Sequence, residues 1–213
     1  MIGFSLLTGS FVAYALFSML PAVHALDSSF LHYVQGFSCP VLKYGLVPFV
    51  IVGSVEISVF ALLVFSFWLY GKGDLKKAYL VLAVLLIFTG IEFTMKQLIH
   101  HSTVPMEYRG RFPFIPVIGS ADIDTNYSFP SGHSLRSALL FGLIFLWSSL
   151  GRWKGAFLAF VLIYLLVQIL GMNYYGFHWT SEVIGGYWLA VVALSLVNRV
   201  AQNGLYKNSR ENS

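Results

Sequence analysis

Charged side chains are scarce in this sequence, and cysteine is scarcer still. Lys, Arg, Asp and Glu make up 10% of the 213 residues, whereas 57% are hydrophobic. Soluble domains carry about 25% charged residues, so the composition indicates a protein of the lipid bilayer. With Cys39 as the one cysteine, a disulfide within the chain is excluded. The net charge of +4 gathers in short loops, which favours a topology signal over nucleic-acid binding.

Long apolar runs make up most of the chain. A membrane-spanning helix needs about 20 mostly apolar residues, and the runs that qualify are 4–25, 44–70, 78–99, 131–150, 155–173 and 181–200. The first run has no basic segment before it, so we expect a retained helix and not a signal peptide. The predicted fold is all-α, a polytopic membrane protein with six transmembrane helices in one bundle. Residues 1–213 are expected to form a single domain, whose polar tail at about 201–213 is disordered near its end.

Basic residues predict the orientation of this bundle. If the six spans alternate, one side collects Lys72, Lys76, Lys77, Arg152, Lys154, Arg199, Lys207 and Arg210. By the positive-inside rule that side, with both termini, is cytoplasmic. The long polar loop 102–129, between the third and fourth spans, then lies on the extracytoplasmic side of the cell membrane. The amphipathic segment 30–37 is predicted to lie along the interface.

One stretch, 129–136, joins this loop to the fourth apolar run with the residues Phe-Pro-Ser-Gly-His-Ser-Leu-Arg. Ser131 is a good N-cap, and Gly132 allows the backbone to approach a ligand closely. His133 then falls in the first helical turn, where free N–H groups and the helix dipole favour an anion. Arg136 adds a positive charge on the same face. Taken alone, the stretch can equally be an ordinary helix start with an interfacial histidine.

A second stretch, 176–182, also opens an apolar run and carries a histidine with an acid four residues later. Together the two stretches resemble the type 2 phosphatidic acid phosphatase family, whose soluble relatives include vanadium haloperoxidases. That family has three motifs: Lys followed by Arg-Pro, then Pro-Ser-Gly-His, then Ser-Arg followed by Gly-x-His-x-x-x-Asp. Residues 130–133 match the second motif completely. The third motif is matched in register at Tyr174, Gly176, His178 and Ser181.

Three positions depart from the family pattern. Lys96 stands at the first-motif Lys, but Thr103 occupies the place of the first-motif Arg. Met172 replaces the Arg of the third motif and cannot hold a phosphate oxygen. Glu182 replaces the Asp, keeps its charge and can still orient the imidazole of His178.

Three arginines are candidates to supply the missing charge. Arg109 is the preferred replacement in the loop and Arg111 the second choice, while Arg136 lies beside the second-motif histidine. The two loop arginines can instead be solvated or contact lipid headgroups.

Ionisable residues inside the apolar runs are expected to be paired or functional. Glu92 and Lys96 are four residues apart, the spacing of a helical ion pair. Either they neutralise each other, or Lys96 binds phosphate as the resemblance implies. Glu56 has no partner in the sequence. For His100 and His101 an interfacial role is favoured over a metal site, because no further metal-ligand motif is present.

The resemblance implies a lipid phosphatase that needs no metal or other cofactor. His178 would attack phosphorus and carry a phosphohistidine, Glu182 would hold its other ring nitrogen, and His133 would protonate the leaving group. The implied phosphate-binding residues are Lys96, Arg109, Arg111, Ser131, Gly132 and Arg136.

Several lipid phosphates fit such a site at the outer face of the membrane. They are phosphatidic acid, phosphatidylglycerophosphate and isoprenoid diphosphates such as undecaprenyl diphosphate. A lipid phosphotransferase that uses the same intermediate, or a non-catalytic lipid-binding protein of the same fold, are the alternatives. No nucleic-acid partner is expected, and the sequence does not define an oligomeric state.

Overall fold

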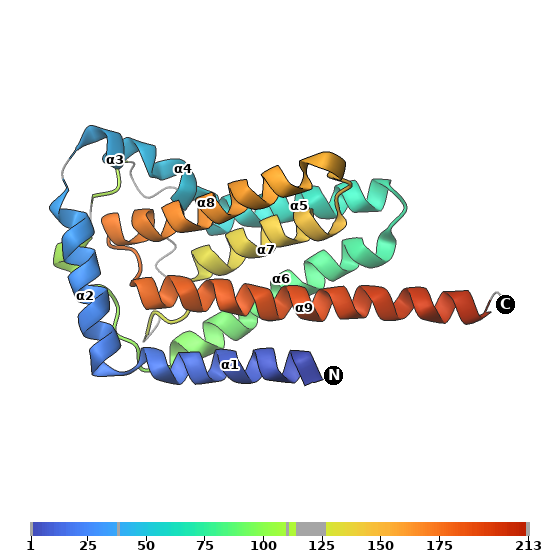
Figure 1. Ribbon diagram of the computed structural model, residues 1–213, viewed down its shortest axis with the longest axis horizontal. Helices are drawn as coiled ribbons and strands as arrows, with labels where there is room; N and C mark the ends of the chain where they lie inside the picture. The colour runs from blue at the N-terminus through green and yellow to red at the C-terminus, as the bar shows by residue number, and fades with distance from the viewer. Residues whose placement is uncertain (1, 38, 110, 114–126, 212–213) are drawn as a thin grey trace.

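The computed structural model describes residues 2–37, 39–109, 111–113 and 127–211, and the regular structure in these ranges is helical (Figure 1). The helices are α1 (Ile2–Ser18), α2 (Pro21–Gly36), α3 (Pro40–Gly45), α4 (Val47–Ile51), α5 (Val55–Gly71), α6 (Leu75–Leu98), α7 (Gly132–Trp147), α8 (Lys154–Tyr174) and α9 (Thr180–Glu211), with short 3-10 turns η1 (Met106–Tyr108) and η2 (Gly151–Trp153). The predicted all-α class is confirmed for the described residues.

The lengths of these helices fit a bilayer. Three described segments are long and apolar enough to cross a membrane: α6, η2 with α8, and the first part of α9. Two bent pairs, α1 with α2 and α3–α4 with α5, raise the number to five if each pair is one span, while α7 is apolar but only 16 residues long. The chain is a helical membrane protein, and the count of six spans stays a prediction.

Two predicted boundaries are wrong. The first run does not form one span over 4–25, because the chain bends by 76° between α1 and α2. Pro21 begins α2, where its missing N–H costs no helical hydrogen bond. At the other end of the chain, α9 continues through Glu211 instead of ending near residue 200.

The second predicted span, 44–70, is interrupted where a neighbouring helix comes close. Ser54 caps the start of α5 by accepting a hydrogen bond from the N–H of Ile57 at 3.4 Å. A Cβ at Gly53 would lie 2.5 Å from the carbonyl oxygen of His133, so any larger residue would push the first turn of α7 away. Gly53 therefore permits the turn between α4 and α5 to approach α7 closely.

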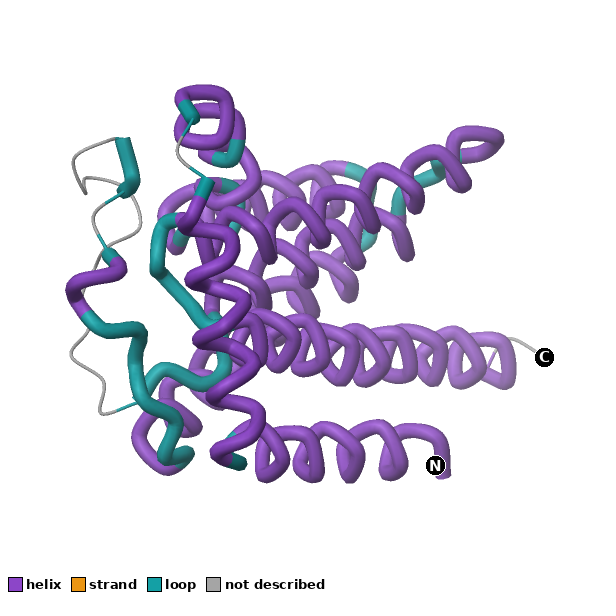
Figure 2. Tube along the Cα trace, turned by 60° about the vertical axis from the view of Figure 1, so that its left-hand side comes forward, coloured by secondary structure: helices purple, strands orange, loops and turns teal. Residues whose placement is uncertain are grey.

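The candidate active site lies at one end of the bundle. Figure 1 shows α2 lying across this end and both termini near the opposite end. Figure 2 shows the longest loop segments gathered beside α2. The central helix α7 packs on α9, α5, α8 and α6, and its buried face contributes Leu135, Leu139 and Leu143 to the main apolar core. This packing fixes the first turns of α7 and α9 side by side.

Candidate active site

The Pro-Ser-Gly-His residues 130–133 stand where α7 begins. Ser131 is the N-cap, as predicted: its Oγ accepts a hydrogen bond from the N–H of Ser134 at 3.4 Å, which satisfies a donor that the helix leaves free. The N–H of Ser131 donates to the carbonyl of Glu182 at 3.0 Å. A Cβ at Gly186 would clash with the carbonyl of Ser131. The start of α7 is thus packed directly on the start of α9.

The two motif histidines face each other. The ring centroids of His133 and His178 are 6.0 Å apart, and the Phe177 ring stacks on His133 at 6.3 Å. His178 follows a turn at Gly176, whose φ of +70° suits glycine. A Cβ at Gly176 would also clash with the carbonyl of Tyr108, so the loop after α6 folds back onto this turn.

Glu182 holds one of these rings. Its fully buried carboxylate accepts hydrogen bonds at Oε2 from Nδ1 of His178 at 2.6 Å and from the N–H of Trp179 at 3.3 Å. The hydroxyl of Ser128 donates to Oε1. The predicted contact between His178 and Glu182 is present. Because Nδ1 is engaged, Nε2 is the nitrogen of His178 left for chemistry.

A second histidine shares this carboxylate, and sequence reasoning missed it. The buried His101 places Nδ1 3.0 Å from Oε1 of Glu182, off the N–H direction, so the contact acts through charge. Its Nε2 lies 3.1 Å from Oγ of Ser181, which in turn donates to Asp27 from its hydroxyl and its N–H. The predicted interfacial role of His101 is wrong. Its neighbour His100 is exposed, as that interpretation requires.

Charges around His101 favour its protonated form. Burial lowers the pKa of His101, but the close contact with the Glu182 carboxylate and the charge of Asp27 outweigh burial and raise this pKa above its usual value. The protonated form of His101 is therefore favoured in its place between the buried side chains of Glu182 and Asp27.

This arrangement predicts how stability depends on pH. When the pKa of a histidine in the folded state exceeds its unfolded value of about 6.5, that histidine contributes its full stabilisation below a pH of about 6.5. The contribution is lost as pH rises through the folded-state pKa. The free energy of unfolding of the wild type, relative to His101→Gln, should therefore fall as pH rises above about 6.5. Thermal unfolding in detergent across this range measures the difference. His100→Gln should behave like the wild type, and parallel curves for His101→Gln and the wild type would contradict a charged His101.

A cluster of three charges lies on the other side of the α7 terminus. The buried carboxylate of Glu92 is 2.9 Å from Nζ of Lys96 and 3.0 Å from Nη1 of Arg136, whose Nε donates to the carbonyl of Gly53 at 3.3 Å. The predicted helical pair is present and extends to Arg136. A Cβ at Gly132 would clash with Oε1 of Glu92. The space that Gly132 leaves is therefore filled by a carboxylate of the chain itself.

The two loop arginines make contacts of their own. Nε of Arg109 donates to the carbonyl of Val104 at 2.9 Å. Nη1 of Arg111 donates to the carbonyl of Gln35 at 2.6 Å, and its guanidinium lies 5.6 Å from the centroid of the Tyr174 ring. The structure thus places Arg111 against α2 and α8, and does not pair either arginine with Glu92. The loop residues 114–126 lie outside the described residues.

Met172 has an apolar environment. Its side chain is fully buried in a cluster with Val47, Val50, Tyr175 and Val183. This environment suits a thioether and explains why no charge is needed at this position for the fold. Position 172 therefore supplies no positive charge in place of the third-motif Arg.

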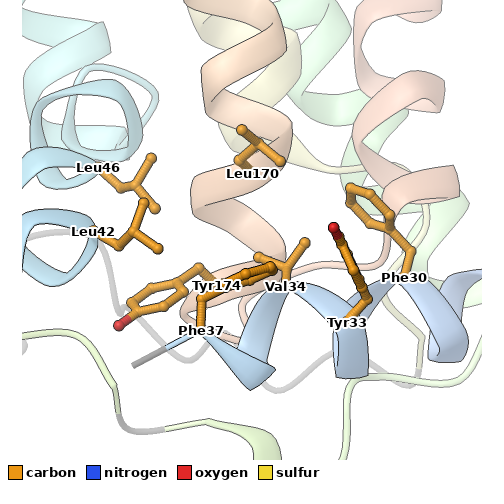
Figure 3. A pocket seen from close by; sticks show the side chains of 8 residues that line it. All are labelled: Phe30, Tyr33, Val34, Phe37, Leu42, Leu46, Leu170 and Tyr174. Carbon is orange, nitrogen blue, oxygen red and sulfur yellow. The ribbon is translucent and has the colours of Figure 1, made fainter. Parts of the chain in front are cut away.

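An apolar groove of about 290 Å³ opens between α2, the α3–α4 region and α8 (Figure 3). It is lined by Phe30, Tyr33, Val34, Phe37, Leu42, Leu46, Leu170 and Tyr174. Tyr174 also lies beneath the guanidinium of Arg111, so one lining residue of the apolar groove contacts a cation.

These features define an integral membrane protein with a two-histidine site, one ring held by a buried carboxylate, at one end of a helix bundle. Comparison with protein families gives a more specific result. Residues 92–205 match the model of the PAP2 superfamily, and this match covers more than half of the chain. The chain belongs to the PAP2 superfamily, which confirms the family resemblance of its motifs. This membership supports a membrane phosphatase acting on lipid.

A solved structure shares the fold. It is described as the crystal structure of the first transmembrane PAP2 type phosphatidylglycerolphosphate phosphatase from Bacillus subtilis. The TM-score is 0.76, the sequence identity is 18%, and the match covers 95% of this chain and 98% of the other. At this identity the likeness shows a common fold. Comparison with curated proteins gives no significant match.

Proposed function

We propose that the protein is a lipid phosphatase that works through a phosphohistidine and needs no metal. The observation that supports this most directly is the 2.6 Å hydrogen bond from Nδ1 of His178 to Glu182, with the ring of His133 6.0 Å away. A carboxylate on one ring nitrogen fixes the tautomer and makes the other nitrogen a better nucleophile. A nucleophilic histidine and a second histidine that can act as a general acid fit a double displacement at phosphorus.

Each residue then has a defined task. Nε2 of His178 attacks phosphorus, and His133 donates a proton to the leaving oxygen. Lys96, Arg136 and backbone N–H groups at Gly132 hold the phosphoryl oxygens, with Arg109 or Arg111 closing from the loop. Water then attacks the phosphohistidine and releases phosphate. The shortage of arginine at Thr103 and Met172 makes these remaining donors necessary.

The apolar groove supports a place for the lipid part of the substrate. The groove suits an acyl or isoprenoid chain, and Arg111, which contacts its lining residue Tyr174, suits a phosphate headgroup. Phosphatidic acid, phosphatidylglycerophosphate and isoprenoid diphosphates all meet this description.

Phosphate release from a panel of these lipids tests the proposal. Purified protein in detergent with EDTA should release phosphate from at least one of them, since no step needs a metal. Retention of the label on an added lipid alcohol, instead of free phosphate, would identify a phosphotransferase. Release from no member of the panel would contradict the proposed activity and leave a lipid-binding protein.

We also propose that the site faces the extracytoplasmic side, with both termini cytoplasmic. Basic residues support this orientation: Lys76 lies at the end of the bundle opposite the site, where Nζ donates to the carbonyl of Val200 at 2.7 Å. The loop after α6 then lies outside the cell.

Cysteine labelling can check the orientation. The exposed native thiol is removed first by Cys39→Ser. An impermeant maleimide should then label Thr103→Cys in intact cells, but should label Lys76→Cys and Arg152→Cys only after the membrane is opened. The reverse pattern would place the site in the cytoplasm.

A further inference from the structure

Glu92 occupies the position in which a phosphate would be expected. Its two oxygens contact Lys96 and Arg136, and the carboxylate lies against Gly132 at the first turn of α7. Two cations and a helix N-terminus are the usual surroundings of a bound phosphate. Only 6% of Glu92 is exposed, so its carboxylate is held in this place by the fold.

Lys96 and Arg136 keep hydrogen-bond donors free while they contact Glu92. A lysine ammonium has three donors, and an arginine guanidinium has five. Lys96 contacts Glu92 through its ammonium group. Arg136 contacts Glu92 and also donates to the carbonyl of Gly53. Donors remain for a phosphoryl group that binds beside Glu92, but the positive charge it meets is already partly neutralised.

Few other cations are available at this end of the bundle. Between residues 112 and 135 the sequence contains no Lys or Arg. Arg109 and Arg111 keep their charge, but each already donates to a backbone carbonyl away from Glu92, and Lys43 is exposed. The negative charge of Glu56 also acts on the guanidinium of Arg136. The two cations nearest the start of α7, Lys96 and Arg136, therefore meet a phosphate with part of their charge already neutralised by Glu92.

We propose that Glu92 is a specificity-determining residue that restricts the site to lipid phosphate monoesters and disfavours diphosphates. This inference rests on the proposed phosphatase function. A monoester carries a charge of about −1.5 to −2 at neutral pH, and a diphosphate ester carries about one negative charge more. At the short range set by the shared cations, repulsion between that extra charge and Glu92 should weaken use of the diphosphate by about tenfold or more.

The test compares two substrates with the same tail, farnesyl phosphate and farnesyl diphosphate, in detergent micelles. The measured quantity is the ratio of kcat/KM for the diphosphate to that for the monophosphate. Glu92→Gln keeps the size of the side chain and removes its charge, and it should raise this ratio about tenfold or more. Glu107→Gln, which removes an exposed carboxylate from the loop after α6, should leave the ratio unchanged. An active Glu92→Gln protein with the wild-type ratio would overturn the proposal.

Binding of two inorganic anions to the wild type supplies a test that needs neither a stable variant nor turnover. Isothermal titration should show tighter binding of orthophosphate than of pyrophosphate. Tighter binding of pyrophosphate would overturn the role of Glu92, whether or not Glu92→Gln folds. If the wild type hydrolyses neither lipid, the phosphatase proposal fails, and the two titrations still decide whether the site selects for low charge.

Discussion

His178→Ala should abolish phosphate release from every substrate and prevent formation of a phosphoprotein. The nucleophile is lost, and the other histidine beside Glu182, His101, is buried with its Nε2 bonded to Ser181. A loss of about 10⁴- to 10⁶-fold in kcat is expected for removal of a covalent nucleophile. Rapid acid-free quenching with ³²P-labelled lipid measures the intermediate, because a phosphohistidine is labile in acid.

His133→Ala is the matched variant, since this ring lies on the same site without a carboxylate partner among its described contacts. Loss of a general acid should cost about 10²- to 10⁴-fold with a lipid substrate. An aryl phosphate with a good leaving group needs little protonation and should restore much of the rate. Rescue of His178→Ala but not of His133→Ala would reverse the two roles. A labelled intermediate in neither the variants nor the wild type would argue against covalent catalysis.

Glu182→Gln should have the second largest effect. The carboxylate accepts from His178, Trp179 and Ser128 and also faces His101, and an amide can serve only part of these donors. Loss of the correct tautomer at a catalytic histidine lowers kcat by about 10⁴-fold in a comparable arrangement. A buried donor left without a partner costs about 1–3 kcal/mol of folding free energy in addition.

Glu182→Asp separates these two effects. It restores the residue of the family motif, keeps the charge and shortens the reach, so kcat should stay well above that of Glu182→Gln. Steady-state kinetics and thermal unfolding in detergent, measured on both variants, give the comparison. Equal activity of the Asp and Gln variants would show that charge at this position does not assist His178.

Local sequence signals predicted the parts of the site whose partners are close in the chain. The N-cap at Ser131 and the pair of Glu92 with Lys96 follow from helix geometry, and the contact of His178 with Glu182 follows from their spacing of four residues. Family motifs added the meeting of two distant histidines. Gly132 and Arg136 were placed at the correct helix start, but their contact with Glu92 depends on how α6 packs on α7.

Other parts could not be predicted because they exist only in the packed bundle. Asp27 and Ser181 are 154 positions apart, and His101 and Ser181 are 80 apart, so no helical period connects them. The bend before Pro21 brings Asp27 over the site, and hydropathy alone does not distinguish a bent helix pair from one long span. The available sequence signal for Asp27 was its position as a lone acidic residue just after the first apolar run.

The contact of Asp27 with Ser181 bears on whether the segment that matches the family can keep its structure without the rest of the chain. The family match begins at residue 92, yet both hydrogen bonds to Asp27 anchor the start of α9 from outside that match. Gly53, also outside it, makes room for the first turn of α7. The segment that carries the family motifs is therefore not a self-sufficient unit. Exchanging it between relatives, without the first 91 residues that evolved beside it, would transfer the histidines but leave behind part of what holds them in place.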